Sequence, residues 1–366
     1  MDSFGQAGRE DKMQFVEYMN DQAARHPAME PADVMKLCYQ ASFGAEHLLE
    51  DRETAYQYLL RECDQVHPEQ SEPLYEFISE GVCRVNLRAW KYRKLPVEWI
   101  FQMFAATSAQ PPQGGMAMFR NYLQEALELA DAGVFHFSRK EWEEFLRDYP
   151  VGNPVAVHHS EAYRQAERPA YRLVCARFFR IFPVLEAICD AWTDAGVPGR
   201  CVIAIDGRCA SGKSTLAEQL SMITGAGVIH MDDFFLPPKL RTEARLKEPG
   251  GNVHYERFQK EVLPALSRGG DFSYRSFDCS RMELGEERKV SGNGIYVVEG
   301  AYSCHPKLEE YMTLRVFSDV EGDEQLRRIG IRDGELALET FKQRWIPMEE
   351  NYFAAYGIRE QADLVL

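Results

Sequence analysis

Two hydrophobic patterns divide the chain near residue 196. Over residues 1–196, apolar residues recur at three- and four-residue spacing among good helix formers, which is the pattern of amphipathic helices. The spacing is clearest in five segments, at 34–50, 53–64, 97–106, 116–131 and 170–192. We therefore expect residues 1–196 to form a mostly α-helical domain.

Residues 197–366 follow a different pattern, in which short apolar runs alternate with helix-like segments. The runs are typical of buried parallel strands and stand at 201–206, 227–230, 294–299, 313–319 and 363–366. A segment rich in glycine and proline, 194–200, precedes the first run and marks the domain boundary. The alternation predicts an α/β domain in which a parallel sheet of about five strands lies between helices.

A long insertion, residues 238–293, separates the second and third apolar runs. Within it, 271–278 and 287–291 can pair as a two-stranded ribbon. The mixture of aromatic and polar residues suits a small polar substrate with a ring portion, and the alternative is an ordinary surface excursion. The candidate substrate-binding residues in and just before the insertion are Asp233, Phe234, His254, Tyr255, Phe277 and Asp278.

The composition narrows the expected partners and compartment. A net charge of −15 disfavours a general binder of nucleic-acid backbones. No apolar run approaches the ~20 residues that are needed to span a membrane. The nine cysteines include no Cys-x-x-Cys pair, which disfavours a zinc site or a disulfide framework. We therefore expect a cytoplasmic protein that binds neither nucleic acid nor membranes.

The first apolar run of the second half leads directly into a glycine-rich segment, Gly207-Arg-Cys-Ala-Ser-Gly-Lys-Ser214. This segment fits the phosphate-binding loop pattern G-x-x-x-x-G-K-[ST]. In such a loop, backbone N–H groups hold an anion, Lys213 reaches the β- and γ-phosphates, and the Ser214 hydroxyl ligates Mg²⁺. The expected nucleotide-binding residues are Gly207, Arg208, Cys209, Ala210, Ser211, Gly212, Lys213, Ser214 and Thr215. The predicted cofactors are ATP and Mg²⁺.

Acidic and basic residues follow the later runs at positions that fit phosphate chemistry. Asp232 follows the second run, and ligands of such sheets bind beyond the carboxyl ends of the strands. A carboxylate there can accept a proton from an attacking hydroxyl, whereas the alternative role is a helix cap. Glu299 ends the third run, where an acid supports Mg²⁺. Arg328 and Arg332 lie four residues apart and can close over the phosphates, unless they form a solvated face.

Two polar patches in the N-terminal half suggest a second site. One contains Gln40 and His47, and the other contains His158, His159 and Arg164. Together they could form a second ligand site. The alternative is that these residues serve only as helix caps and interhelical hydrogen bonds.

Residues 200–366 resemble the uridine kinase-like group of P-loop kinases, which includes nicotinamide riboside kinase, phosphoribulokinase and bacterial pantothenate kinase. The resemblance lies in the segments 210–214, 230–235, 277–278, 299–300, 326–333 and 362–366. It implies that Asp232 is the general base and that Lys213 and Ser214 hold phosphate and Mg²⁺. It also implies that Arg328 and Arg332 stabilise the transferring phosphoryl group.

Three features depart from this family and argue against uridine itself as the substrate. His254 stands near the position of an aspartate that grips the ribose in uridine kinases. The histidine of their substrate ribbon has no clear counterpart after Asp278. The lid is short, because Gly334 follows soon after Arg332.

These observations lead to one main hypothesis and two alternatives. The main hypothesis is an ATP-dependent kinase that phosphorylates a hydroxyl of a small polar metabolite, nucleoside-like or sugar-like. The first alternative is a nucleotide-dependent ATPase or switch whose helical domain binds a partner. The second is a bifunctional enzyme with another active site near His47 and His159. A homodimer formed through the helical domain is a further hypothesis about partners.

Overall fold

The computed structural model describes residues 15–45, 51–110, 115–195 and 200–366, and it divides into two compact units. The N-terminal unit is Met1–Phe179 and the C-terminal unit is Arg180–Leu366. The boundary between the two units, after Phe179, lies earlier in the chain than the domain boundary predicted at residue 196. The reason is that helix α9 (Phe182–Ala195), which the sequence pattern placed in the first half, packs on the central sheet of the second unit.

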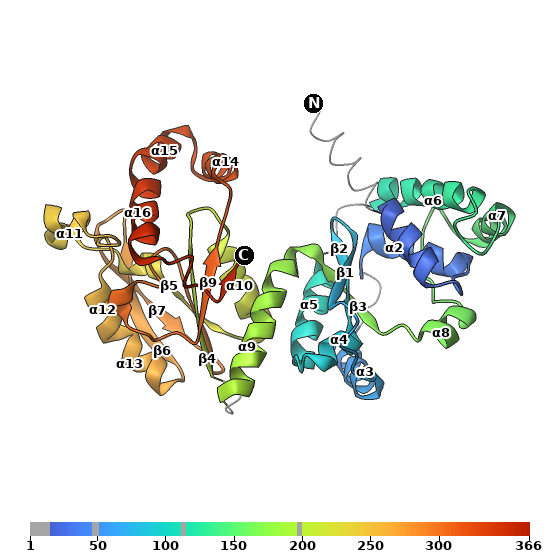
Figure 1. The fold of residues 1–366 in the computed structure, drawn as a ribbon, viewed down its shortest axis with the longest axis horizontal. Helices are drawn as coiled ribbons and strands as arrows, with labels where there is room; N and C mark the ends of the chain where they lie inside the picture. The colour runs from blue at the N-terminus through green and yellow to red at the C-terminus, as the bar shows by residue number, and fades with distance from the viewer. Residues whose placement is uncertain (1–14, 46–50, 111–114, 196–199) are drawn as a thin grey trace. The chain divides into compact units, whose positions relative to one another are not determined.

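The N-terminal unit is mostly helical, but it also contains a sheet that the sequence pattern did not predict. Its helices are a helix over 15–25, α2 (Pro31–Phe43), α3 (Arg52–Gln65), α4 (Leu87–Tyr92), α5 (Val97–Ala109), α6 (Gly115–Asp131), α7 (Arg139–Asp148) and α8 (Glu161–Glu167). In the described part of this unit, β1 (Tyr75–Ser79), β2 (Val82–Asn86) and β3 (Tyr171–Cys175) form an antiparallel sheet in the order β1-β2-β3 (Figure 1).

Neighbouring residues of β3 show that helices cover both faces of this sheet. The Tyr171 hydroxyl lies 3.3 Å from the Gln40 amide of α2, whereas Arg172 forms an ion pair with Glu62 of α3 at 2.5 Å. The segment 170–192, which was predicted to be a helix, therefore begins with a strand. Helical spacing was misleading here, because pairing with β2 supplies backbone hydrogen-bond partners that lie far away in the sequence.

The C-terminal unit is built on a parallel sheet, and each of the five predicted apolar runs forms one of its strands. The strands are β4 (Cys201–Gly207), β5 (Gly227–His230), β8 (Ile295–Glu299), β9 (Leu314–Ser318) and β10 (Leu364–Val365). Among the described residues their order is β10-β9-β4-β8-β5, with β4 at the centre. All seven residues of β4 are buried, as expected for a strand with neighbours on both sides and helices over the sheet.

Helices and a ribbon surround this sheet (Figure 1). The helices are α9, α10 (Lys213–Thr224), α11 (Glu243–Lys247), α12 (Tyr255–Glu261), α13 (Leu263–Arg268), α14 (Gly322–Asp333), α15 (Glu335–Thr340) and α16 (Ile346–Tyr356). Helix α10 packs on β4, β5 and β8. The predicted ribbon is present as the antiparallel pair β6 (Phe272–Asp278) and β7 (Glu283–Val290).

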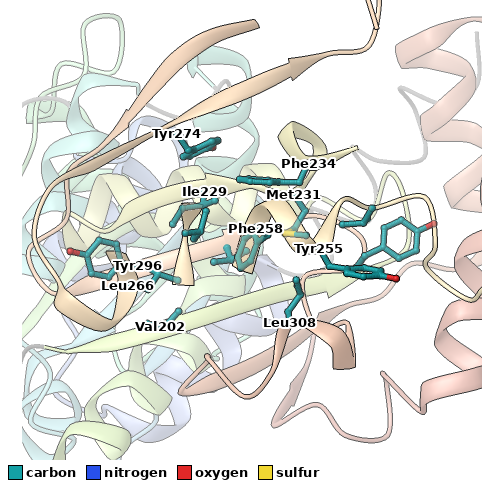
Figure 2. Close-up of a cluster of buried hydrophobic side chains, with 14 of the residues drawn as sticks. Val202, Ile229, Met231, Phe234, Tyr255, Phe258, Leu266, Tyr274, Tyr296 and Leu308 are labelled. Atoms are coloured by element: carbon teal, nitrogen blue, oxygen red, sulfur yellow. The ribbon is translucent and has the colours of Figure 1, made fainter. Parts of the chain in front are cut away.

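Part of the insertion at 238–293 belongs to the hydrophobic core, whereas α11 and most of β7 lie at the surface. Phe258 of α12, Leu266 of α13 and Tyr274 of β6 are buried in the same cluster as Ile229 of β5 (Figure 2). Phe234 is completely buried between Phe258 and Tyr274, with ring centroids 5.1 and 5.2 Å away. Burial of these aromatic rings attaches the insertion firmly to the sheet.

Candidate active site

The loop after the central strand β4 turns directly into helix α10. Gly207 ends β4 with a φ of 131°, and a Cβ at this position would lie 2.1 Å from the Ser318 carbonyl oxygen of β9. Gly212 has a φ of 93° and caps the N-terminus of α10. These two glycines let the loop pass close to the sheet and reach the positive end of the helix dipole, a geometry that binds anions.

A cavity of about 860 Å³ lies beside this loop. Its wall includes six of the nine predicted nucleotide-binding residues, namely Cys209, Ala210, Gly212, Lys213, Ser214 and Thr215. The other three lie outside the wall. Gly207 packs on β9 and Ser211 is buried. The Arg208 guanidinium is turned to Asp319 and Glu350, at 2.6 and 2.7 Å, so its side chain is already paired.

The Lys213 side chain folds back onto the phosphate-binding loop. It is 9% exposed, and its ammonium donates hydrogen bonds to the carbonyl oxygens of Gly207 at 2.8 Å and Arg208 at 2.7 Å. The cation therefore lies at the loop itself, where an anion held by the loop would meet it.

Oxygen atoms from helix α10 and strand β8 lie close together in the cavity wall. The Ser214 hydroxyl donates to Glu299 Oε2 at 3.2 Å, and Glu299 Oε1 lies 2.6 Å from His230 Nδ1. The hydrogen bond with Glu299 raises the pKa of His230 above its usual value. A serine hydroxyl beside a nearly buried carboxylate is a donor set that fits Mg²⁺, which prefers oxygen ligands and keeps several waters and phosphate oxygens.

Asp232 follows β5 in a short 3₁₀ turn and lines the same cavity. In the described part of the chain its carboxylate makes no hydrogen bond or ion pair. The side chain is accessible from the cavity, but protein walls surround it. This burial, together with the nearby Glu299 carboxylate, raises the pKa of Asp232, and the Lys213 ammonium opposes the shift. An acid with a raised pKa and no structural partner is suited to accept a proton.

Helix α14 brings two arginines to the cavity wall, as the four-residue spacing predicted. Arg328 donates from Nη1 to the Ala210 carbonyl oxygen at 3.3 Å, and Arg332 also lines the cavity. Arg327, which directly precedes Arg328, pairs with Glu324 at 2.6 Å and is not part of the wall. Arg328 shares this partner, with its Nε 2.7 Å from Glu324 Oε1. The helix therefore places two arginines in the cavity wall: Arg328 contacts the phosphate-binding loop, whereas Arg332 pairs with Asp333 at 2.8 Å.

Other residues of the wall were missed by the sequence reasoning. They include Arg241, Asn252, Phe341, Arg344 and Trp345. The last three belong to a π-helical turn, Phe341–Trp345, between α15 and α16. Such turns are frequent at functional sites, but no local sequence signal announces one.

The six predicted substrate residues are all described by the structure, and they lie outside this cavity wall. Asp233 is buried and accepts hydrogen bonds from the Tyr274 hydroxyl and Arg288 Nε, both at 2.8 Å. It thus attaches the β6-β7 ribbon to the turn after β5. Phe234 belongs to the hydrophobic core described above. Although they directly follow Asp232 in the chain, the side chains of Asp233 and Phe234 do not line the cavity that Asp232 lines.

The remaining four serve local structure. His254 is the N-cap of α12 and accepts a hydrogen bond from the Arg257 N–H at 3.3 Å. The Tyr255 ring lies under the Arg245 guanidinium, 3.7 Å from its carbon. Phe277 is buried in β6, and Asp278 accepts hydrogen bonds that close the ribbon turn. None of these four residues lines the cavity, because residue type alone does not show which way a side chain faces.

Asp206, the residue before the loop, is a positioning residue that the sequence reasoning missed. It is completely buried at the end of β4 and accepts four hydrogen bonds. The donors are the backbone N–H groups of Gly207 (2.7 Å), Tyr302 (3.1 Å) and Cys304 (2.9 Å) and the hydroxyl of Tyr352 (2.8 Å). One carboxylate thus fixes the loop, the segment after β8 and helix α16.

Asp206→Asn is expected to lower the free energy of unfolding by about 2–4 kcal/mol, because the amide nitrogen leaves two buried donors without an acceptor. Urea denaturation of the variant and of wild type measures the difference. Asp271→Asn, which changes an exposed acid, is the control and should leave the midpoint unchanged. Equal midpoints for Asp206→Asn and wild type would contradict this role.

The sheet order and the loop together show that the C-terminal unit has the P-loop kinase fold predicted from the sequence.

No model of a known protein family matches the chain, and no curated protein matches it. Solved structures do match. One, described as a "Possible Uridine Kinase" from Bacillus stearothermophilus, is 21% identical and covers 50% of this chain and 100% of its own, with a TM-score of 0.37. Another, a "putative fructose transport system kinase" from Silicibacter sp. TM1040, is 21% identical and covers 49% and 98%, with a TM-score of 0.38.

Among the described residues of the two polar patches in the N-terminal unit, only Gln40 and His159 come together. Gln40 and His159 meet at the Tyr171 hydroxyl, at 3.3 and 2.8 Å. His158 and Arg164 are exposed on the surface. His47 lies outside the described residues. Over the described ranges, no helix has the length and apolar character that crossing a membrane requires.

Proposed function

We propose that this protein is an ATP-dependent kinase that transfers the γ-phosphoryl group to a hydroxyl of a small polar metabolite, nucleoside-like or sugar-like. The observation that carries the proposal is a single cavity that collects the phosphate-binding loop, Ser214 with Glu299, the unpaired Asp232 and two arginines of α14. In-line phosphoryl transfer needs a phosphate cradle, a metal site, a base and a cationic clamp, and each has a candidate here.

Each group has a defined task in this proposal. The loop and Lys213 would bind the triphosphate, while Ser214 and Glu299 would hold Mg²⁺. The metal ion, when bound, neutralises charge on the β- and γ-phosphate oxygens. Asp232 accepts the proton of the acceptor hydroxyl as that oxygen attacks phosphorus. Arg328 and Arg332 stabilise the negative charge of the transferring group, and their helix shields the site from water.

The cavity also supports a small acceptor. Its volume of about 860 Å³ falls within the range of ligand pockets. This volume supports binding of a triphosphate together with a small second molecule. In addition to Asp232, the cavity wall contains Arg241 and Asn252, which can donate hydrogen bonds to an acceptor molecule. Trp345 in the same wall supplies an aromatic face. These groups support an acceptor with several hydroxyls or a flat ring.

The test is a screen of nucleosides and sugars with the full-length protein, ATP and Mg²⁺, in which phosphate monoesters are detected by mass spectrometry. The proposal expects ADP formation that depends on one acceptor and equals the monoester formed. ATP hydrolysis at the same rate with and without every acceptor would reject the kinase and favour an ATPase or switch.

Glu299→Gln is expected to raise the Mg²⁺ concentration needed for half-maximal activity by about 10- to 100-fold, because the neutral amide attracts the ion and its waters less strongly. The measurement is a Mg²⁺ titration of turnover at fixed ATP. Glu283→Gln, an exposed change on the β6-β7 ribbon, serves as the matched control. A Glu299→Gln protein with the wild-type Mg²⁺ requirement would remove Glu299 from the metal site.

A further inference from the structure

The N-terminal unit contains a cavity of its own, which the proposed kinase reaction does not use. Its volume is about 240 Å³, and it lies between the helix over 15–25, the three-stranded sheet and α8. Arg84, on the central strand β2, lines it and is only 6% exposed. A buried arginine in a cavity wall requires an explanation, because charge is costly to remove from water.

Arg84 has no acidic partner among the described residues. Its single hydrogen bond runs from Nη2 to Gln40 Oε1 at 2.6 Å, and its guanidinium lies 4.3 Å from the Tyr171 ring centroid. Its Nε is buried without a partner. The other basic side chains of the wall each lie at ion-pair distance from an acid, as Arg25–Glu76 (2.8 Å), Arg88–Glu72 (3.0 Å) and His26–Glu167 (2.9 Å).

A chain of hydrogen bonds orients this cation without neutralising it. Gln40 accepts from Arg84 and donates to the Tyr171 hydroxyl at 3.3 Å; that hydroxyl donates to His159 Nε2 at 2.8 Å. His159 Nδ1 then donates to Asp33 at 2.7 Å. Burial lowers the pKa of His159 to about 4, so the ring is neutral at pH 7. The Asp33 carboxylate at the end of this chain of bonds is four hydrogen bonds away from Arg84. Glu76, in the cavity wall, attracts Arg84 electrostatically but forms its ion pair with Arg25.

A second unsatisfied donor stands in the same wall. Gln22 is 2% exposed, and its Nε2 has no hydrogen-bond partner. Arg84 Nε and Gln22 Nε2 are thus buried donors without a partner, on two residues that line the same cavity. Such a pair of donors, one of them on a cation, is complementary to an acceptor with negative charge.

We propose that this cavity binds a small carboxylate anion, with the carboxylate on Arg84 and Gln22. The planar guanidinium fork matches the geometry of a carboxylate. The wall also contains Glu72, Glu76 and Glu167, which repel a phosphate dianion more strongly than a carboxylate monoanion. This site is independent of the proposed kinase reaction, so neither proposal depends on the other.

The test measures the thermal unfolding midpoint of the full-length protein with acetate, pyruvate, succinate or inorganic phosphate at constant ionic strength, followed by calorimetry for any carboxylate that raises it. The expected result is a saturable increase with at least one carboxylate and none with phosphate. Arg84→Met should weaken that binding at least 100-fold, and Gln22→Met at least fivefold. Without a carboxylate, Arg84→Met should unfold at the wild-type temperature or higher, since it removes an unpaired buried charge.

Arg172→Met is the matched control, because Arg172 lies on the opposite face of the same sheet and pairs with Glu62. It should retain carboxylate binding. If Arg84→Met does not fold, Arg84→Lys, which keeps the charge but not the fork, must still weaken binding at least tenfold. The proposal is overturned if none of the three carboxylates binds, if phosphate binds as well as they do, or if binding survives Arg84→Met or Arg84→Lys.

Discussion

Asp232→Asn should lower kcat for phosphoryl transfer by about 10²- to 10⁴-fold, the usual contribution of a general base, while the affinity for ATP stays close to that of wild type. The reason is geometric. The carboxylate of Asp232 faces the cavity and, in the described chain, makes no bond that supports the fold, so the amide should remove proton acceptance without disturbing the loop. Steady-state kinetics with the acceptor found by the screen, and ATP binding by calorimetry, check both parts.

Asp278→Asn is the matched control for this variant. Asp278 was a candidate substrate-binding residue from the sequence, but it caps the exposed ribbon turn, so Asp278→Asn should change kcat by less than about twofold. Equal losses in the two variants, or a kcat for Asp232→Asn within about threefold of wild type, would show that another group takes the proton.

The pH dependence of wild type supplies a second readout of Asp232. Because burial and Glu299 raise its pKa, the base is lost as the pH falls through a value above that of an ordinary aspartate. The acid limb of kcat/KM should therefore lie at a higher pH than an ordinary aspartate would give, with activity present above that limb and lost below it. In Asp232→Asn the residual activity should no longer show this limb.

Arg332→Met is expected to reduce kcat by about 10³-fold or more, which is the lower end of the effect of an arginine that stabilises phosphoryl-transfer charge. The Arg332 guanidinium carbon lies 5.9 Å from the Phe341 ring centroid. Methionine loses this contact but keeps an unbranched apolar side chain that suits a helix, so α14 should still form. Because the charge to be stabilised develops mainly in the transition state, KM for ATP should change much less than kcat. Arg328→Met should act in the same direction.

Arg327→Met tests whether such a loss is specific to the cavity. Arg327 lies on the same helix, but it is paired with Glu324 and absent from the cavity wall, so its variant should keep nearly full activity. A kcat for Arg332→Met that matches Arg327→Met would place the phosphoryl clamp elsewhere in the wall, with Arg344 as the next arginine to replace.

Local patterns were sufficient for part of the site. The phosphate-binding loop could be recognised because strand, glycines, lysine and serine stand in consecutive positions, and the spacing of Arg328 and Arg332 placed both on one side of a helix. Asp232 and Asp233, by contrast, are neighbours of the same type with opposite surroundings. One faces the cavity, and the other is held by Tyr274 and Arg288, which come from a ribbon some forty residues later.

The amino-acid sequence by itself determined the C-terminal fold, because apolar runs bounded by glycine and acidic residues specify the strands, the loop and their alternation with helices. Only the tertiary structure decided the strand β3, the four hydrogen bonds of Asp206, the cavity wall from Phe341 to Trp345 and the lack of an acidic partner for Arg84 among the described residues. Each of these depends on partners far away in the chain. Spacing within a segment carries no information about such partners, since they are chosen by packing and by the need to satisfy buried polar groups.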